Sequence, residues 1–296
     1  MIKRTLEISR DPAYLSVSLD QLQIKREDHP PASIPCEDIG VVLVDHPQVT
    51  YTHGALVKLA ESDAVVVVCG KNHLPVALVM PIADHSQVVW RVNEQIAVGK
   101  PLRKQLWKQL VQAKVRAQAA VLPPDSAARR KLLALARQVR SGDPENVEAR
   151  AARVYWGCWL PDRPFRRDPD GDDLNPLLNY GYAVVRAAVA RAIVAAGLLP
   201  SLGLKHCHRA NAFCLADDLM EPLRPLVDDR VRRLSLEGVE RVDQQSKASL
   251  LELLSEEVAF LGERGPLMVN LHRFVASLVR CYRGEDERLA IPQRCK

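Results

Sequence analysis

At 296 residues with 47% hydrophobic side chains, the chain can bury the core of one large domain or two ordinary ones, which excludes a disordered protein. No apolar run approaches the ~20 residues of a membrane span, and no secretory apolar segment follows the N-terminus. We therefore expect a cytoplasmic protein with no membrane partner. The seven cysteines are scattered without a Cys-x-x-Cys pair, which argues against a disulfide framework or a zinc site.

The formal charge of +5 is unevenly distributed along the chain. Through residue 90, seven Lys and Arg stand against eleven Asp and Glu, whereas between Lys100 and Arg140 eleven bases stand against Asp125 alone. A solvated helix surface usually carries both signs, so this block favours contacts with a polyanion such as nucleic acid. The candidate DNA-binding residues are Arg103, Lys104, Lys108, Arg129, Arg130 and Lys131.

The first part of the chain alternates apolar and polar residues, as half-buried strands do. Strands are expected at residues 5–8, 14–19, 21–24, 40–44, 64–68 and 76–79, with a loop at 28–31 and a short helix at His53–Glu61. We predict a small β-rich domain over residues 1–88.

From residue 89 the apolar residues recur at helical spacing, and prolines or glycines separate the periodic segments. Helices are expected at residues 102–121, 127–139, 144–156, 177–196, 247–261 and 267–282. We predict a larger helical domain over residues 89–296.

The segment from Lys205 to Pro225 concentrates polar chemistry. It opens with His206 and His208 and closes with Asp217, Asp218 and Glu221. Spacing of three places Asp218 and Glu221 on one helix face. Imidazole and carboxylates that converge on one point suit a divalent cation, and the alternative is a solvated acidic helix with a histidine packed nearby.

Three strings occur in a recognisable order: VEARAARVYW at 147–156, NPLLNYGYAVVR at 175–186 and LADDLMEPLRP at 215–225. In order and spacing they resemble the CRISPR adaptation integrases, most closely those of type II loci, over nearly the whole chain. The resemblance implies an α+β fold, in which a small N-terminal β-sandwich or β-roll precedes a larger all-α catalytic domain. It also implies a homodimer.

The resemblance further implies a metal triad of Glu148, His206 and Glu221 that holds Mg²⁺ or Mn²⁺. Similar type II proteins carry a His-His pair where this chain has Lys205-His206, so His208 is a rival to His206 as the ligand. Asp218 matches a nearby carboxylate that either supports the metal ligands or faces DNA.

The implied function is a metal-dependent DNA endonuclease and integrase. It would insert DNA fragments as spacers into the repeat and leader region of a CRISPR array by 3′-hydroxyl transesterification, with a small second adaptation protein. No Gly-x-x-x-x-Gly-Lys-[Ser/Thr] loop is present, so ATP is not implied. The alternatives are a non-catalytic nucleic-acid-binding scaffold of the same fold and a helical enzyme for small phosphates, which would leave the basic block unexplained.

Overall fold

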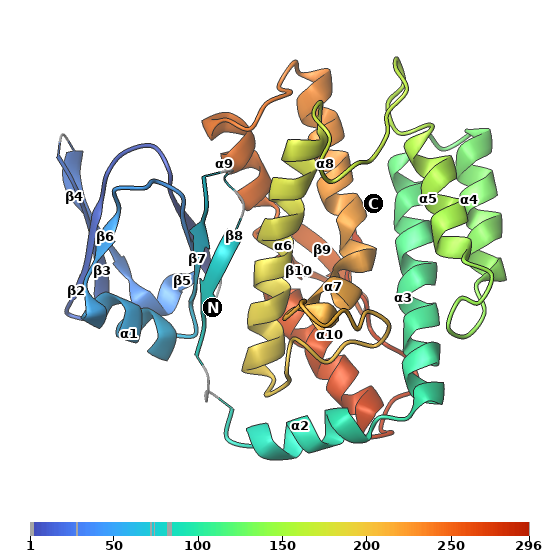
Figure 1. Ribbon diagram of the computed structural model, residues 1–296, viewed down its shortest axis with the longest axis horizontal. Helices are drawn as coiled ribbons and strands as arrows, with labels where there is room; N and C mark the ends of the chain where they lie inside the picture. The colour runs from blue at the N-terminus through green and yellow to red at the C-terminus, as the bar shows by residue number, and fades with distance from the viewer. Residues whose placement is uncertain (1–2, 28, 72, 74, 82–84, 296) are drawn as a thin grey trace.

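The computed structural model describes residues 3–27, 29–71, 73, 75–81 and 85–295, and it has strands first and mostly helices afterwards (Figure 1). The predicted α+β class is confirmed. The strands are β1 (Arg4–Ile8), β2 (Tyr14–Ser18), β3 (Gln21–Arg26), β4 (His29–Pro35), β5 (Ile39–Val44), β6 (Thr50–Tyr51), β7 (Val65–Cys69), β8 (Pro75–Val79), β9 (Glu257–Phe260), β10 (Glu263–Pro266) and β11 (Gln293–Arg294).

Ten α-helices and two 3₁₀ turns complete the described structure. They are α1 (His53–Glu61), α2 (Val88–Ala97), α3 (Lys100–Val121), α4 (Ala127–Gln138), α5 (Val147–Trp156), α6 (Asn175–Ala195), α7 (Cys214–Met220), α8 (Arg224–Leu236), α9 (Gln244–Glu252) and α10 (Leu267–Tyr282), with η1 (Cys36–Asp38) and η2 (Glu221–Leu223). Strands give way to helices between the end of β8 and the start of α2, and the boundary at residue 88 itself stays a prediction.

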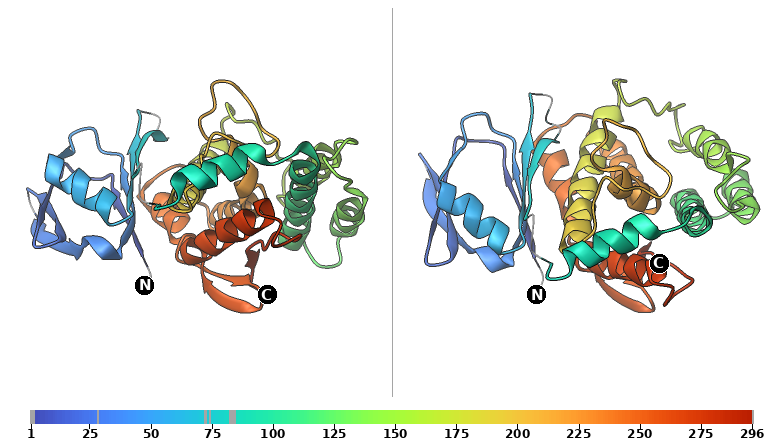
Figure 2. Two further views of the ribbon diagram at one scale, coloured as in Figure 1. Left: turned by 90° about the horizontal axis from the view of Figure 1, so that it is seen from below. Right: turned by 60° about the horizontal axis from the view of Figure 1, so that its bottom comes forward.

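Two four-stranded sheets build the N-terminal part, in the orders β1-β5-β7-β8 and β4-β3-β2-β6. Alternate residues of β5 and β7 point to opposite faces. Val42 and Val66 belong to a core with the second sheet and α1, whereas Val41 and Val65 belong to the large core of the helices. The central strands β5 and β7 therefore contribute to both cores, and Figure 2 shows their sheet between α1 and the helical part.

Two expectations about local structure were wrong. The expected loop at 28–31 falls partly outside the described residues, and from His29 onward the chain forms β4. In this sheet β4 is an edge strand that pairs with β3 alone. Its prolines lack an amide hydrogen, but no strand on the open side needs one for a hydrogen bond. The expected helix at 247–261 stops at Glu252, since Leu261 and Gly262 have φ of 51° and 85° and turn β9 back into β10. The helical part thus includes a small sheet, β10-β9-β11.

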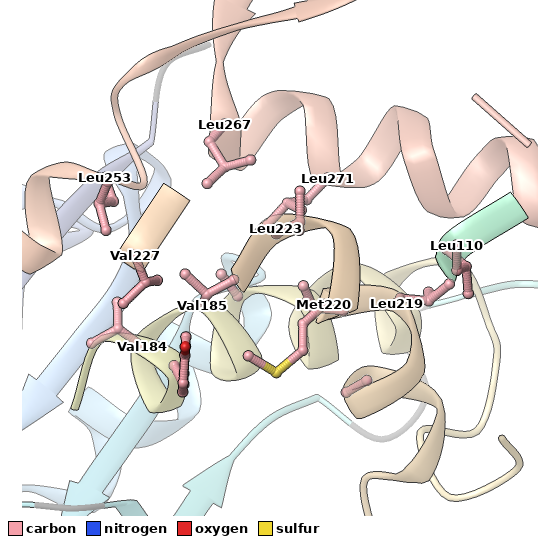
Figure 3. Packing of buried hydrophobic residues seen from close by; sticks show 14 of the residues in the cluster. Leu110, Val184, Val185, Leu219, Met220, Leu223, Val227, Leu253, Leu267 and Leu271 are labelled. Atoms are coloured by element: carbon pink, nitrogen blue, oxygen red, sulfur yellow. The ribbon is translucent and has the colours of Figure 1, made fainter. Parts of the chain in front are cut away.

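Helix α6 lies at the centre of the helical part, as its alanine-rich sequence predicts. It is long and apolar enough to cross a membrane by length and composition, but 78% of its most apolar stretch is buried, which is typical of a core helix. Around it, Val184 and Val185 of α6 pack near Leu219, Met220 and Leu223 (Figure 3). This apolar packing fixes the turn between α7 and η2, where Glu221 lies.

Buried ion pairs join the sheets to the helices. Arg191 of α6 donates from Nε to the Asp63 carbonyl at 2.5 Å and also pairs with the Asp63 carboxylate. Lys247 of α9 pairs with Asp45 just after β5, and the side chains of both residues are nearly inaccessible to water. Each pair contains a charge with little access to water, so separation of the two parts would break an ion pair in a poorly solvated place.

Candidate metal centre

Glu148 lies in the first turn of α5, where the chain supplies an unusual cap. Asp143, rather than the residue before the helix, accepts hydrogen bonds from the Val147 and Glu148 amides, at 2.9 and 3.0 Å. These bonds satisfy two amides that have no partner within the helix. The backbone of Glu148 is therefore held at a defined place while its carboxylate remains partly exposed.

Glu221 lies where α7 passes into η2, and it is 5% exposed. Its Oε1 accepts from Arg224 Nε at 2.9 Å. Burial acts to raise the pKa of Glu221, but the Arg224 guanidinium and the Lys114 ammonium outweigh burial and lower the pKa to about 2. Glu221 is therefore an ionised, buried carboxylate at neutral pH.

Lys114 of α3 connects these two carboxylates. Its Nζ lies 2.6 Å from Glu148 Oε1 and 2.5 Å from Glu221 Oε2. Burial acts to lower the pKa of Lys114, but Glu221 and Glu148 reverse this effect and raise it. The structure thus brings Glu148 and Glu221 together around a positive charge.

His206 lies in the loop before α7, and Asp218 organises that loop. The His206 Nδ1 lies 2.6 Å from Asp218 Oδ1, and Asp218 Oδ2 accepts from the amides of Leu204 and Lys205 at 2.6 and 2.9 Å. With Nδ1 engaged by a carboxylate, Nε2 is the ring nitrogen left to bind a metal. The His206 ring also meets the Trp107 ring edge-on, with centroids 5.7 Å apart.

The environment of His206 links it to the two glutamates. The hydrogen bond to Asp218 is the main cause that raises the pKa of His206, and the charges of Glu221 and Glu148 add to it. Asp218 is fully buried, which favours its supporting role over the DNA-facing one. Both rings are exposed, but His208 lacks the bond to Asp218, and among the described residues its Nδ1 accepts from the Ala210 amide at 3.3 Å.

The loop that carries His206 passes so close to Gly203 that no side chain fits there. A Cβ on Gly203 would lie 2.4 Å from the His206 carbonyl and 2.8 Å from Asp218 Oδ2. Any larger residue would therefore displace the loop that carries His206.

The buried carboxyl group of Asp228 links the helices that surround the site. Asp228 of α8 accepts from the hydroxyl of Tyr182 of α6, and the hydroxyl of Tyr155, two turns after Glu148, lies beside it. Burial raises the pKa of Asp228 to about 7, although these hydroxyls and Arg224 oppose the shift. The contacts tie α5, α6 and α8 together, and they leave Tyr155 fully buried.

The donor set fits a divalent cation. Within the described part of the chain, no three His, Cys, Asp or Glu side chains stand close enough to hold a metal as they are. The Lys114 ammonium, however, lies between the Glu148 and Glu221 carboxylates, a position that a divalent cation could take, and the Nε2 of His206 is left free by the bond of Nδ1 to Asp218. Carboxylates suit Mg²⁺, and the imidazole makes Mn²⁺ at least as suitable.

The six predicted DNA-binding bases lie on α3 and α4, and all are half-buried or exposed. Among the described residues, none of the six pairs with a carboxylate within 4.0 Å, so their charge is available to a ligand. Lys114, counted in the same basic block, is the exception because it is buried in the site.

Sequence reasoning missed Lys114, Asp143 and Gly203. Lys114 follows Trp107 and Leu110 at spacings of seven and four, which places it on the buried stripe of α3. A lysine at an apolar position of a helix indicates a buried charge, and this indication is present in the sequence. Asp143 and Gly203 depend on loop geometry that no periodicity reveals.

Comparisons with known proteins agree with this architecture. A family described as "CRISPR associated protein Cas1" matches residues 6–249. A "CRISPR-associated endonuclease Cas1" from Neisseria meningitidis serogroup C (strain 8013) is 39% identical over 228 residues, which cover 76% of this chain and 73% of that protein.

Two solved structures have the same fold. One is titled "Casposase bound to integration product" (TM-score 0.82, 21% identity, 97% of this chain and 92% of that one). The other is titled "Cas6-RT-Cas1--Cas2 complex" (TM-score 0.78, 18% identity, 98% of this chain and 36% of that one).

Fold, sequence and the grouped carboxylates together define a nuclease or integrase of CRISPR adaptation. Within this class the chain belongs to the Cas1 family, because the family match spans most of its length.

Proposed function

We propose that the chain is a divalent-metal-dependent DNA endonuclease and integrase that inserts DNA fragments as spacers into a CRISPR array. The observation that carries the proposal is the grouping of Glu148 and Glu221 around one cation position, with the oriented His206 in their electrostatic range. Helices α3 and α4, whose Lys and Arg side chains are mostly free of ion pairs with the protein's own carboxylates among the described residues, would hold the DNA.

In this proposal Glu148, Glu221 and His206 hold the metal, and Asp218 keeps the His206 Nε2 available for it. When bound, the metal polarises the scissile phosphate and favours attack by a DNA 3′-hydroxyl. Arg224 keeps Glu221 ionised and in place through its 2.9 Å hydrogen bond. With water in place of the 3′-hydroxyl, the same site would act as a nuclease.

We also propose that the chain works as a homodimer in the cytoplasm, with a small second adaptation protein and with prespacer and repeat DNA. The related architecture titled "Cas6-RT-Cas1--Cas2 complex" and the casposase titled as bound to an integration product support these partners.

A strand-transfer assay tests the proposal. A labelled fragment with 3′-hydroxyl ends is incubated with a repeat-containing target, the small partner protein and Mg²⁺ or Mn²⁺. Joined product that disappears with EDTA supports the proposal. Bound DNA without cleavage or joining in either metal favours the non-catalytic scaffold.

His206 and His208 should differ strongly in their effect on catalysis. We expect His206→Ala to reduce cleavage at least about tenfold, the scale seen when metal-supporting groups are removed. His208→Ala should change it within about twofold, because among the described residues its ring contacts the nearby Ala210 amide and pairs with no carboxylate. Initial rates in Mn²⁺ measure both, and the reverse ranking would transfer the ligand role to His208.

The basic residues of α3 and α4 should contribute affinity rather than chemistry. For duplex DNA, every phosphate that the protein no longer neutralises reduces the slope of log K against log salt by about 0.9. A variant with Lys104, Lys108 and Lys131 changed to Gln should therefore bind with a slope flatter by about two to three units. Fluorescence anisotropy across a salt series measures this slope, and an unchanged slope would show that these residues do not touch DNA.

A further inference from the structure

Lys114 differs from the other bases of α3 and α4 in its surroundings. Those bases are half-buried or exposed, whereas Lys114 is buried and its Nζ contacts Glu148 and Glu221 at 2.6 and 2.5 Å. It comes from a third element, between the helix that carries Glu148 and the turn that carries Glu221. The ammonium therefore stands where the proposed metal would bind.

The two carboxylates need a cation to remain together. Like charges repel, and Glu221 is buried, so its charge must be compensated within the protein. Arg224 bonds to Oε1 of Glu221, whereas Lys114 meets Oε2. Lys114 alone among the described side chains bridges both carboxylates.

We propose that Lys114 is an internal counter-ion that keeps Glu148 and Glu221 gathered before a metal enters, and that the divalent ion displaces it from both. This inference rests on the proposed function, because it assigns the same carboxylates to the metal. A divalent ion and an ammonium repel each other and cannot share the space between the same two oxygens. Metal binding therefore includes the cost of moving Lys114.

The displaced ammonium has an acceptor on its own helix. Gln118 follows Lys114 by four residues, so the two side chains are neighbours on α3. The Gln118 side chain is 2% exposed, and its Oε1 lacks a hydrogen-bond partner among the described residues. A lysine has three donors on a flexible stem, and by moving to Gln118 it would satisfy this buried oxygen.

Mn²⁺ binding measured by calorimetry without DNA tests the exchange. Lys114→Met keeps the stem and removes the competing charge, so its Kd for Mn²⁺ should fall about tenfold, equivalent to about 1.4 kcal/mol. Lys114→Arg keeps the charge and should bind Mn²⁺ no more tightly than wild type. Arg116→Met removes an exposed charge from the same helix and should leave the Kd unchanged.

Thermal unfolding gives a second readout that needs no activity. In EDTA, Lys114→Met should melt about 5 °C below wild type, because two carboxylates lose their counter-ion, and saturating Mn²⁺ should close this gap. The variant is purified in Mn²⁺ and then chelated. Unfolding on chelation alone would support the inference in the same way.

Equal or weaker Mn²⁺ binding by Lys114→Met would overturn the inference, as would an unchanged melting temperature in EDTA. Glu148→Ala separates this failure from that of the proposed function. If wild type binds Mn²⁺ in a Glu148-dependent manner and Lys114→Met binds no more tightly, only the counter-ion role fails. If wild type binds no Mn²⁺, or binds it equally well without Glu148, the metal proposal fails and the inference fails with it.

Discussion

Replacing Glu148 with alanine should abolish DNA cleavage and strand joining, with a reduction of at least about a hundredfold. Glu148 shares one cation position with Glu221, and its carboxylate has no other ion-pair partner than Lys114 among the described residues. Its removal takes a ligand from the metal but leaves Lys114 paired with Glu221. The variant should therefore stay folded and bind DNA normally while it loses catalysis.

Glu145→Ala is the matched control, because it removes an acid three residues earlier that pairs only with Arg140 at the surface. Initial rates in Mg²⁺ and in Mn²⁺ are compared with thermal unfolding and DNA affinity. Near-wild-type activity of Glu148→Ala in Mn²⁺ would show that Glu148 is not a ligand. For Glu221 the gentler change is Glu221→Gln, since glutamine keeps an oxygen that can accept from Arg224 Nε and alanine does not.

A DNA fragment that ends in a dideoxynucleotide should fail to join, while any hydrolytic nicking by the protein continues. Joining breaks one phosphodiester as it forms another, so it needs neither ATP nor a covalent protein–DNA intermediate. The sequence carries no nucleotide-binding loop. Tyr155 is fully buried behind the site, so the structure gives its hydroxyl no access to DNA. In the proposed mechanism the DNA 3′-hydroxyl is therefore the nucleophile.

The measurement uses paired fragments that differ only in the terminal 3′-hydroxyl, with the small partner protein and Mg²⁺ or Mn²⁺ present. Denaturing gels separate joined DNA, nicked DNA and any protein adduct. Joining by the dideoxy fragment, or an adduct that survives denaturation, would contradict the mechanism. Cys207→Ser serves as the protein-side control, because its exposed thiol is the remaining candidate nucleophile beside His206 and should have no effect.

Sequence analysis named the residues of the site more completely than it predicted the contacts among them. Glu148, His206 and Glu221 follow from a resemblance that extends over nearly the whole chain, and the structure groups the two glutamates and places His206 in their electrostatic range. Their roles as metal ligands stay a prediction. The spacing of Lys114 from Trp107 and Leu110 indicates that it faces inward, but the carboxylates it meets depend on how α5 and η2 pack against α3, which the sequence does not reveal.

Helix bounds could be predicted from the sequence where the helical spacing of apolar residues ends at a residue that favours a helix end. Helices α1 and α10 have the expected bounds, since a clear amphipathic pattern ends at a recognisable stop in each. The strand β4 was missed because prolines normally signal a loop, and only the sheet order shows that β4 is an edge. The β9–β10 hairpin was missed because its turn depends on a leucine with positive φ.

The buried pairs Arg191–Asp63 and Lys247–Asp45 bear on how the two parts of the chain can move relative to each other. Because they fasten the first sheet to α6 and α9, these pairs oppose bending between the sheets and the turn that carries Glu221. A partner that binds the N-terminal sheets would therefore move together with the helices that surround Glu221, rather than about a hinge between the two parts.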